Sequence, residues 1–263
     1  MIARNSSRRV DLPLFGISAF NIGGPLTFAT LPNAKAITAV TVTPTPAVIA
    51  TPAVDAKVYF DNGKAFLYKN EYDKAISDFT EAIRIDPHYA DAYFDRGHAY
   101  SYQGKYAMAI SDFSEAIRLD PNDSQGYYDR GSAYDSQGNY AMAISDFTDA
   151  IRLNSQDVDA YTSRGFAHAR LRQNNEAISD YTEAIRLAIR LASNYAIPYF
   201  YRGNAYFDQG HFDKAISDFT EAIRIDPHYA DAYYYRGKAY LRVRNRPKAD
   251  ADFAMAARLH GPQ

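Results

Sequence analysis

The sequence predicts an all-α solenoid of six consecutive helical hairpins, and three observations lead to this fold class. A glycine that follows a polar residue recurs every 34 residues, broken once by an interval of 38, and a tyrosine stands four residues before each glycine. Each period contains two stretches with the apolar spacing of an amphipathic helix, separated by a turn. A fixed period of this length indicates stacked units, because one hairpin can bury its apolar face only against its neighbours. The glycines are Gly63, Gly97, Gly131, Gly165, Gly203 and Gly237.

Composition fits a helical protein without a separate catalytic domain. Of the 263 residues, 47% are hydrophobic and 23% are charged, and the six copies fill residues 56–263. The aromatic residues are 23 Tyr and 15 Phe without any Trp, so we expect a tyrosine-rich core. The absence of cysteine excludes disulfides, thiolate metal sites and a cysteine nucleophile. A net charge of −2 without clustered Lys and Arg argues against nucleic-acid binding.

Residues 1–36 have the layout of an export signal. Three arginines precede an apolar stretch, and the segment ends in the small-x-small sequence Ala34-Lys35-Ala36. We expect cleavage near Ala36 and export to the periplasm or the medium, by either the general or the twin-arginine route. A retained amphiphilic leader or a disordered tail is the alternative, and the protein would then be cytoplasmic or loosely membrane-associated.

Residues 37–54, ITAVTVTPTPAVIATPAV, form an uncharged linker rich in Thr, Pro, Ala and Val. Its prolines fix φ and remove backbone donors, so we expect an extended spacer. A proline-rich docking ligand is the alternative, although the basic residues that usually accompany one are missing. The repeat domain then occupies residues 55–263, with copies at 56–89, 90–123, 124–157, 158–195, 196–229 and 230–263.

Residues 90–123 show how one copy is built. Gly104 supplies the turn between the two helices, and Asp120-Pro121 ends the second, because proline disfavours helical geometry in the preceding residue. Glycine inside a helix costs roughly 1 kcal/mol relative to alanine. Gly97 therefore indicates a close helix contact that compensates. The positions that define the copy are Tyr93, Gly97, Tyr100, Ala109, Phe113, Ala116 and Pro121.

These seven positions resemble the tetratricopeptide repeat residue for residue, with tyrosine where that family often has tryptophan. The match recurs in phase in all six copies, with small departures. The resemblance implies a right-handed superhelical solenoid of helix-turn-helix hairpins. It also implies a non-enzymatic protein-interaction scaffold that binds an extended peptide or a partner helix along a concave groove.

The fourth copy departs most from this pattern. Its sequence Ala184-Ile185-Arg186-Leu187 is repeated directly at residues 188–191. Four residues are close to one helical turn, so we expect the second helix to lengthen by about 6 Å with its apolar face still inward. The insertion is either a neutral slip of duplication or a dedicated contact.

An arginine before the repeat glycine and an aspartate before the second-helix aromatic recur through the copies. Both lie beside core positions, so each needs a partner. We expect a structural ladder of Arg–Asp pairs, formed either within a copy, which leaves Asp78 alone, or across copies, which leaves Asp252 alone. The ladder residues are Arg96, Arg130, Arg164, Arg202 and Arg236 with Asp78, Asp112, Asp146, Asp180, Asp218 and Asp252.

In the resembled family a second stripe on each first helix faces the groove. Here that stripe is aromatic with scattered acids, which suits peptide binding, although some of its rings could instead pack between helices. Phe60 and Phe94 stand where the family's clamp for a C-terminal carboxylate needs polar residues, so that clamp is not expected. The predicted groove residues are Phe60, Lys64, Asp91, Phe94, His98, Tyr128, Asp135, Asp159, Phe200, Asn204, Tyr234 and Lys238, with Lys57, Gln125, Thr162, Phe166, Ile197 and Asp231 as further members.

No catalytic constellation appears in the sequence. It contains no phosphate-binding glycine-rich loop and no HExxH motif, and its six histidines are scattered without metal-ligand spacing. We therefore expect no catalytic residue, metal site or cofactor, and a protein partner rather than a nucleic acid or a small-molecule substrate. The alternative function is structural self-assembly through the sixth copy, which has no following hairpin to cover it.

Overall fold

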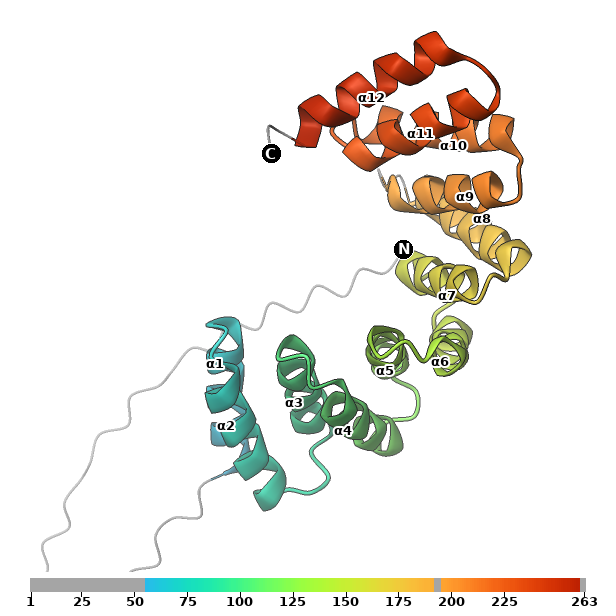
Figure 1. Ribbon diagram of the computed structural model, residues 1–263. Coiled ribbons are helices and arrows are strands. Elements are labelled where there is room, and N and C mark those ends of the chain that lie inside the picture. Colours follow the sequence, from blue (N-terminus) through green and yellow to red (C-terminus); the bar gives the residue numbers. More distant parts are fainter. Residues whose placement is uncertain (1–54, 192–194, 261–263) are drawn as a thin grey trace, which may run out of the picture. The chain divides into compact units, whose positions relative to one another are not determined.

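A computed structural model of the chain describes residues 55–191 and 195–260, which form twelve α-helices and no strand (Figure 1). The predicted all-α fold class is confirmed. The predicted leader and linker, and the last residues of the sixth copy, lie outside the described residues. The helices are α1 Ala56–Tyr68, α2 Tyr72–Ile85, α3 Ala90–Tyr102, α4 Tyr106–Leu119, α5 Ser124–Ser136, α6 Tyr140–Leu153, α7 Val158–Arg170, α8 Asn174–Arg190, α9 Ile197–Asp208, α10 Phe212–Ile225, α11 Ala230–Arg242 and α12 Arg246–His260.

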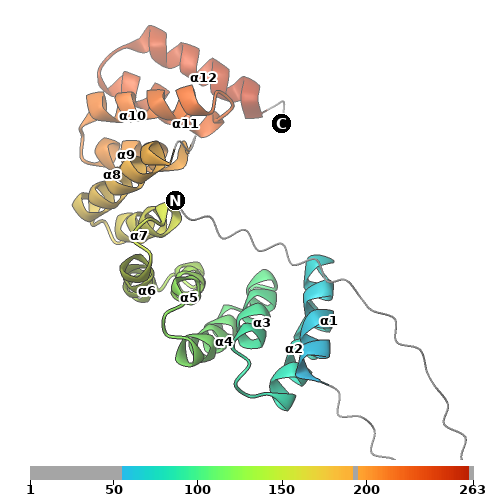
Figure 2. The same ribbon diagram turned by 180° about the vertical axis from the view of Figure 1, so that it is seen from behind.

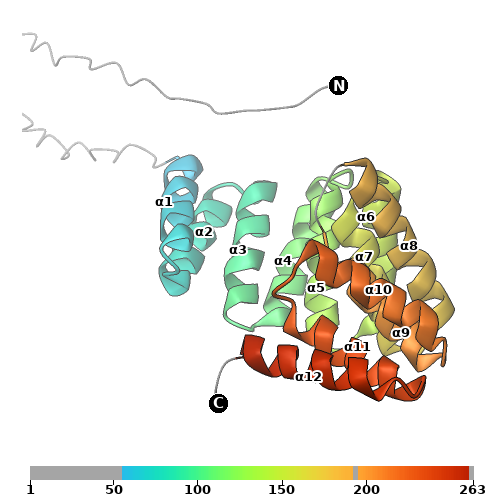
Figure 3. The ribbon, with the colours of Figure 1, turned by 90° about the horizontal axis from the view of Figure 1, so that it is seen from above.

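The helices of the repeat array pack in the order in which they occur in the chain. Each odd-numbered helix pairs with the even-numbered helix after it, and that helix packs on the first helix of the next copy (Figures 1 and 2). Odd-numbered helices of neighbouring copies also contact one another, as α5 contacts α7 and α7 contacts α9. Figure 3 shows the hairpins following one another around a bend. The odd-numbered helices therefore line the inner, concave side of the solenoid.

Each hairpin turn contains one residue in the left-handed backbone region. The position holds glycine in three copies, at φ of 71–80°, and another residue in the other three, at φ of 59–61°. Side chains with a Cβ enter this region at a steric cost. Packing of the two helices therefore imposes the turn even where the glycine is missing. The six residues are Asn70, Gly104, Gly138, Arg172, Gly210 and Arg244.

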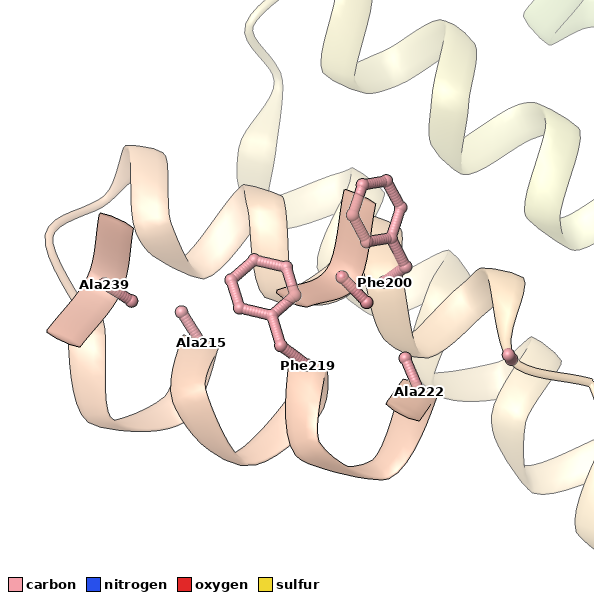
Figure 4. Close-up of a cluster of buried hydrophobic side chains, with 7 residues drawn as sticks. Phe200, Ala215, Phe219, Ala222 and Ala239 are labelled. Atoms are coloured by element: carbon pink, nitrogen blue, oxygen red, sulfur yellow. The ribbon is translucent and has the colours of Figure 1, made fainter. Parts of the chain in front are cut away.

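The repeat glycines allow an aromatic ring of the second helix to lie directly on the first. A Cβ added to Gly97 would stand 2.7 Å from the ring of Phe113, which is 1% exposed. This close contact is the compensation that a glycine within a helix requires. Alanines fill the space around each ring, as Ala215, Ala222 and Ala239 do near Phe219 in the fifth copy (Figure 4).

The insertion in the fourth copy lengthens its second helix, by three residues instead of the four expected. Helix α8 has 17 residues, whereas α2, α4, α6 and α10 have 14 each. Leu187 and the added Ala188 are buried, while the added Ile189 and Leu191 are more than half exposed. The extra turn thus continues the buried face of the helix and also presents apolar surface to solvent.

Candidate binding surface

The arginines and aspartates predicted to form a ladder lie beside one another in five copies. Nε and Nη2 of each arginine donate to the two carboxylate oxygens of the aspartate 16 residues later, at 2.7–2.9 Å. Nη1 donates to a threonine or serine hydroxyl of the preceding copy, at 3.0–3.1 Å. Each guanidinium thus fixes its own hairpin and joins it to the hairpin before.

The pairing is within a copy, which decides between the two alternatives left open by the sequence. Asp78 of the first copy has Asn62 where the later copies have arginine, and burial raises the pKa of this carboxyl. The paired aspartates are 3–6% exposed. In the third copy, hydrogen bonds from Arg130 to Asp146 raise the pKa of the guanidinium. The bidentate arginine stabilises the charge of each buried ladder carboxylate. Asp78 has no such arginine, and its partial burial disfavours the ionised form.

Aromatic rings form a column along the concave side, at the fifth residue of each copy. Five copies carry a ring there, and it packs over the phenylalanine ring of the second helix with centroids 5.6–5.8 Å apart. The fourth copy carries Thr162 instead. The column members are Phe60, Phe94, Tyr128, Phe200 and Tyr234.

Two rings of this column do not have the exposure expected of groove residues. Phe60 and Phe200 are only 7% and 6% exposed, because Tyr89 and Tyr229 from the following loops lie against them at 4.7 and 4.8 Å. These two rings belong to the core between copies and offer little surface to a partner. Tyr234, by contrast, is 45% exposed.

The charged groove residues of the first, second and sixth copies lie on the concave helices and contact their neighbours there. Lys64 lies over the ring of Phe60, and Lys238 lies over Tyr234 and Tyr235. His98 stands 3.3 Å from a carboxylate oxygen of Asp129, while Asp91 is exposed. The concave side therefore has lysines in its terminal copies and carboxylates between them.

A cavity of about 320 Å³ opens on the concave side between α5, α7 and α9. It lies at the break in the aromatic column, since Thr162 lines it where the other copies would place a ring. Its aromatic walls are Phe147, Phe166, Tyr195 and Tyr201, and its hydroxyls are those of Ser132, Ser136, Thr162 and Ser163, with Asp135 and Ile197 completing the lining.

Neighbouring side chains fill only part of the space left by the aromatic ring that Thr162 replaces. Tyr201 stacks on the buried Tyr181 at 5.9 Å, in the space that a ring at Thr162 would approach. Tyr181 stands where the other copies have phenylalanine, and its hydroxyl is buried without a hydrogen-bond partner. Burial raises the pKa of this phenol, so it stays neutral. At the rim, the hydroxyl of Tyr195 donates to Asp159 at 2.7 Å.

Asp135 is the acidic group of the cavity. Its Oδ1 is buried and has no hydrogen-bond partner, and burial raises the pKa of the carboxyl while Arg170 opposes this shift. The guanidinium of Arg170 lies instead over the rings of Tyr140 and Phe166, at 5.0 and 5.8 Å. The other copies have no charged residue at the position of Asp135; they carry Leu67, Ser101, Ala169, Phe207 and Leu241.

The structure brings together only some of the predicted groove residues in this cavity. Asp135, Thr162, Phe166 and Ile197 line it, whereas Asn204 does not, and its Oδ1 is buried without a partner. Sequence reasoning missed the five serine and tyrosine neighbours Ser132, Ser136, Ser163, Tyr195 and Tyr201. The signal that could have located them is the single break in the aromatic column at Thr162.

The described residues contain neither a membrane-spanning helix nor a cluster of metal ligands. Across residues 55–191 and 195–260, no helix has the length and apolar character needed to cross a lipid bilayer. In the same residues, no three His, Asp or Glu side chains are grouped so that they could hold a metal ion.

Solved structures similar to this chain contain the same kind of repeat. MamA is 27% identical, with a TM-score of 0.58 over 62% of this chain and 94% of its own. YrrB, described as a TPR protein with an unusual peptide-binding site, is 26% identical, with a TM-score of 0.57 over 69% of this chain and 91% of its own. PilF of Pseudomonas aeruginosa is 15% identical, with a TM-score of 0.66 over 79% and 93%, and supports the fold alone.

Comparison by sequence gives the family. No curated protein matches the chain. A model described as TPR repeat matches residues 63–104 and 203–243, and three described as tetratricopeptide repeat match residues 90–123, 113–145 and 158–188. The chain therefore belongs to the tetratricopeptide-repeat family, and its fold is that of a protein-interaction scaffold.

Proposed function

We propose that this protein is a non-enzymatic scaffold that binds an extended segment of a partner protein along its concave side. One observation carries the proposal. Residues that hold the hairpins together recur almost unchanged from copy to copy, whereas the concave position directly after the repeat glycine holds lysine, histidine, serine, phenylalanine or asparagine. Side chains that vary on a constant frame can recognise a sequence without disturbing the fold. The peptide-binding site described for YrrB supports this proposal by similarity.

The arrangement of these side chains suits an extended ligand. The first helices of successive copies lie side by side, so equivalent positions form columns that cross several helices. A segment laid along a column meets a different copy at each step. Rings such as Tyr128 and Tyr234 give contact area at low entropic cost, and the carboxylates and lysines between them can set direction and register.

Site-specific photo-crosslinking in the native host tests this proposal. A photo-reactive phenylalanine analogue would replace Tyr128 or Tyr234, and in the control it would replace Met108, which is 51% exposed on α4 of the outer layer. We expect the two concave positions to crosslink to one segment of one partner, identified by mass spectrometry, and Met108 not to do so. Equal capture from Met108 would contradict concave binding.

Self-association through the sixth copy is the alternative function. No hairpin follows α12 in the described residues, and Leu241 and Val243 of this copy are each more than a third exposed. Sedimentation over a concentration series separates the two functions, because a chain that stays monomeric at high concentration excludes assembly by this route. Export remains a proposal from the leader sequence, and N-terminal sequencing of the protein from cells would test cleavage near Ala36.

A further inference from the structure

We propose that the cavity between α5, α7 and α9 accepts a lysine or arginine side chain of the bound segment, with Asp135 as its anionic partner. This inference rests on the proposed function and specifies the chemistry of one subsite within it. The occupant is a basic side chain on an extended peptide, which enters from the concave side where the cavity opens.

The walls of the cavity suit a cation on an aliphatic stem. Phe166 and Tyr201 meet edge to face at 5.4 Å, and Phe147 and Tyr195 complete a wall of aromatic rings. Aromatic faces attract ammonium and guanidinium groups, and they also cover the methylene groups behind the charge. The ring of Phe166 already has the guanidinium of Arg170 5.8 Å from its centroid, outside the cavity lining.

Asp135 supplies a negative charge that the protein itself leaves unmatched. Its Oδ1 accepts no hydrogen bond, and it makes no ion pair with the described residues. Arg170 is close enough to lower the pKa of the carboxyl, but its guanidinium is held between the rings of Tyr140 and Phe166. A cation that enters the cavity would give Asp135 a charge-assisted hydrogen bond in a partly desolvated setting, where such bonds are strong.

The surrounding surface favours a basic segment at this point. The first helices of the second to fourth copies carry Asp91, Asp95, Asp129 and Asp159 and no lysine. Those of the first and sixth copies carry Lys57, Lys64 and Lys238 beside Asp61 and Asp231. Burial raises the pKa of Asp95, and nearby His98 and Lys64 oppose this shift. A run of carboxylates attracts cationic groups and repels anionic ones before contact is made.

Other occupants fit the cavity less well. An apolar side chain would bury the carboxylate of Asp135 without giving it a partner, which is unfavourable. An acidic side chain would meet the like charge of Asp135. The lining of one carboxylate, four hydroxyls and four rings therefore selects a positive group that has an apolar stem.

Selection from a random peptide display library on the purified full chain tests this inference. We expect enriched peptides to carry Lys or Arg at one fixed position. Replacing that residue by acetyl-lysine or citrulline in a synthetic peptide should weaken binding about tenfold or more, as measured by isothermal titration calorimetry.

Four variants test whether the cavity causes the preference for a basic residue. Asp135→Asn removes the charge at constant shape, and Thr162→Phe restores the ring found in the other copies; both should abolish the preference for a basic residue. Asp213→Asn, which removes an exposed carboxylate on α10 of the outer layer, should leave it unchanged. Arg170→Ala should strengthen binding of the basic peptide, because it removes a competing positive charge.

The possible results separate the subsite from the general function. Enrichment of peptides without a fixed basic position, or a basic preference that survives Asp135→Asn, overturns the subsite and leaves concave peptide binding intact. Failure to enrich any peptide overturns both. Thermal unfolding of Asp135→Asn and Thr162→Phe checks that any lost preference occurs in a folded protein.

Discussion

The carboxylates of the ladder are paired within the fold, whereas the carboxylate of the cavity is not. Asp146 of the ladder is 3% exposed, and both of its oxygens accept hydrogen bonds from Arg130. Asp135, on the preceding helix, has a buried oxygen with no partner. The ladder pair recurs in five copies, whereas the acid at Asp135 occurs in one. Repeated positions are those at which the chain satisfies its own charges, and the charge left unsatisfied stands at a position that is not repeated. Function is therefore best sought where the repeat is broken.

Removing one arginine of the ladder should have the largest effect on stability. Arg130→Ala leaves the buried carboxylate of Asp146 and the hydroxyl of Ser114 without their donor, so we expect a loss of about 3 kcal/mol in the free energy of unfolding. Urea denaturation followed by circular dichroism measures this. Arg118→Ala is the matched control, because that side chain is 59% exposed and bridges only to Glu115; it should cost less than about 0.5 kcal/mol. Equal costs for the two variants would mean that the ladder contributes no more than a surface pair.

A methyl group at the repeat glycine should have the next largest effect. In Gly97→Ala the new Cβ would stand 2.7 Å from the buried Phe113 ring, and the strain outweighs the gain in helix propensity, for a net loss of about 1–2 kcal/mol. Gly126→Ala is the control: its Cβ would come closest to the flexible side chain of Ile117, at 3.0 Å, and the equivalent positions in other copies hold the fully buried alanines Ala92 and Ala160. We expect that variant to be neutral or stabilised in the same denaturation experiment. Destabilisation by both changes to the same extent would refute the explanation from ring contact.

These two effects follow from features that the sequence already displays. The period, the close contact at Gly97 and the existence of an Arg–Asp ladder could be predicted because each is set by local spacing that recurs in five or six copies. The sequence could not predict whether each arginine pairs with the aspartate of its own copy or with that of the preceding copy. The way in which the helices cross decides this. Burial of Phe60 was also beyond the sequence, because it depends on Tyr89 folding back from the next loop. The cavity arises from several copies together, so no single copy predicts it.

Adding an arginine to the first copy tests the ladder in the opposite direction. Asn62→Arg places a guanidinium where Asp78 lacks one, and we expect a gain of up to about 1 kcal/mol. Burial now raises the pKa of Asp78, so its ionised form destabilises the fold. With the arginine its pKa should fall below the ordinary carboxyl value, and the new stability should then be present above that value and lost on acidification. Carboxyl NMR titration measures the shift, and Asn62→Lys, which lacks the planar fork, should give a smaller one. A pKa of Asp78 unmoved by the arginine would show that the first copy cannot form the pair.

The smallest effect concerns the unmatched charge itself. Burial raises the pKa of Asp135, so Asp135→Asn should stabilise the fold by about 0.5 kcal/mol, a low value because the side chain is only partly buried. Because the pKa of Asp135 is raised in the folded state, the stability gained by Asp135→Asn depends on pH. The gain is absent below the ordinary carboxyl pKa, grows as the pH rises, and is complete above the raised pKa. Thermal melts of both proteins from acidic to neutral pH measure it. Asp146→Asn, at a paired position, should destabilise under the same conditions. If Asp135→Asn also destabilised the protein at neutral pH, Asp135 would have a partner within the fold, and its charge would not be available to a ligand.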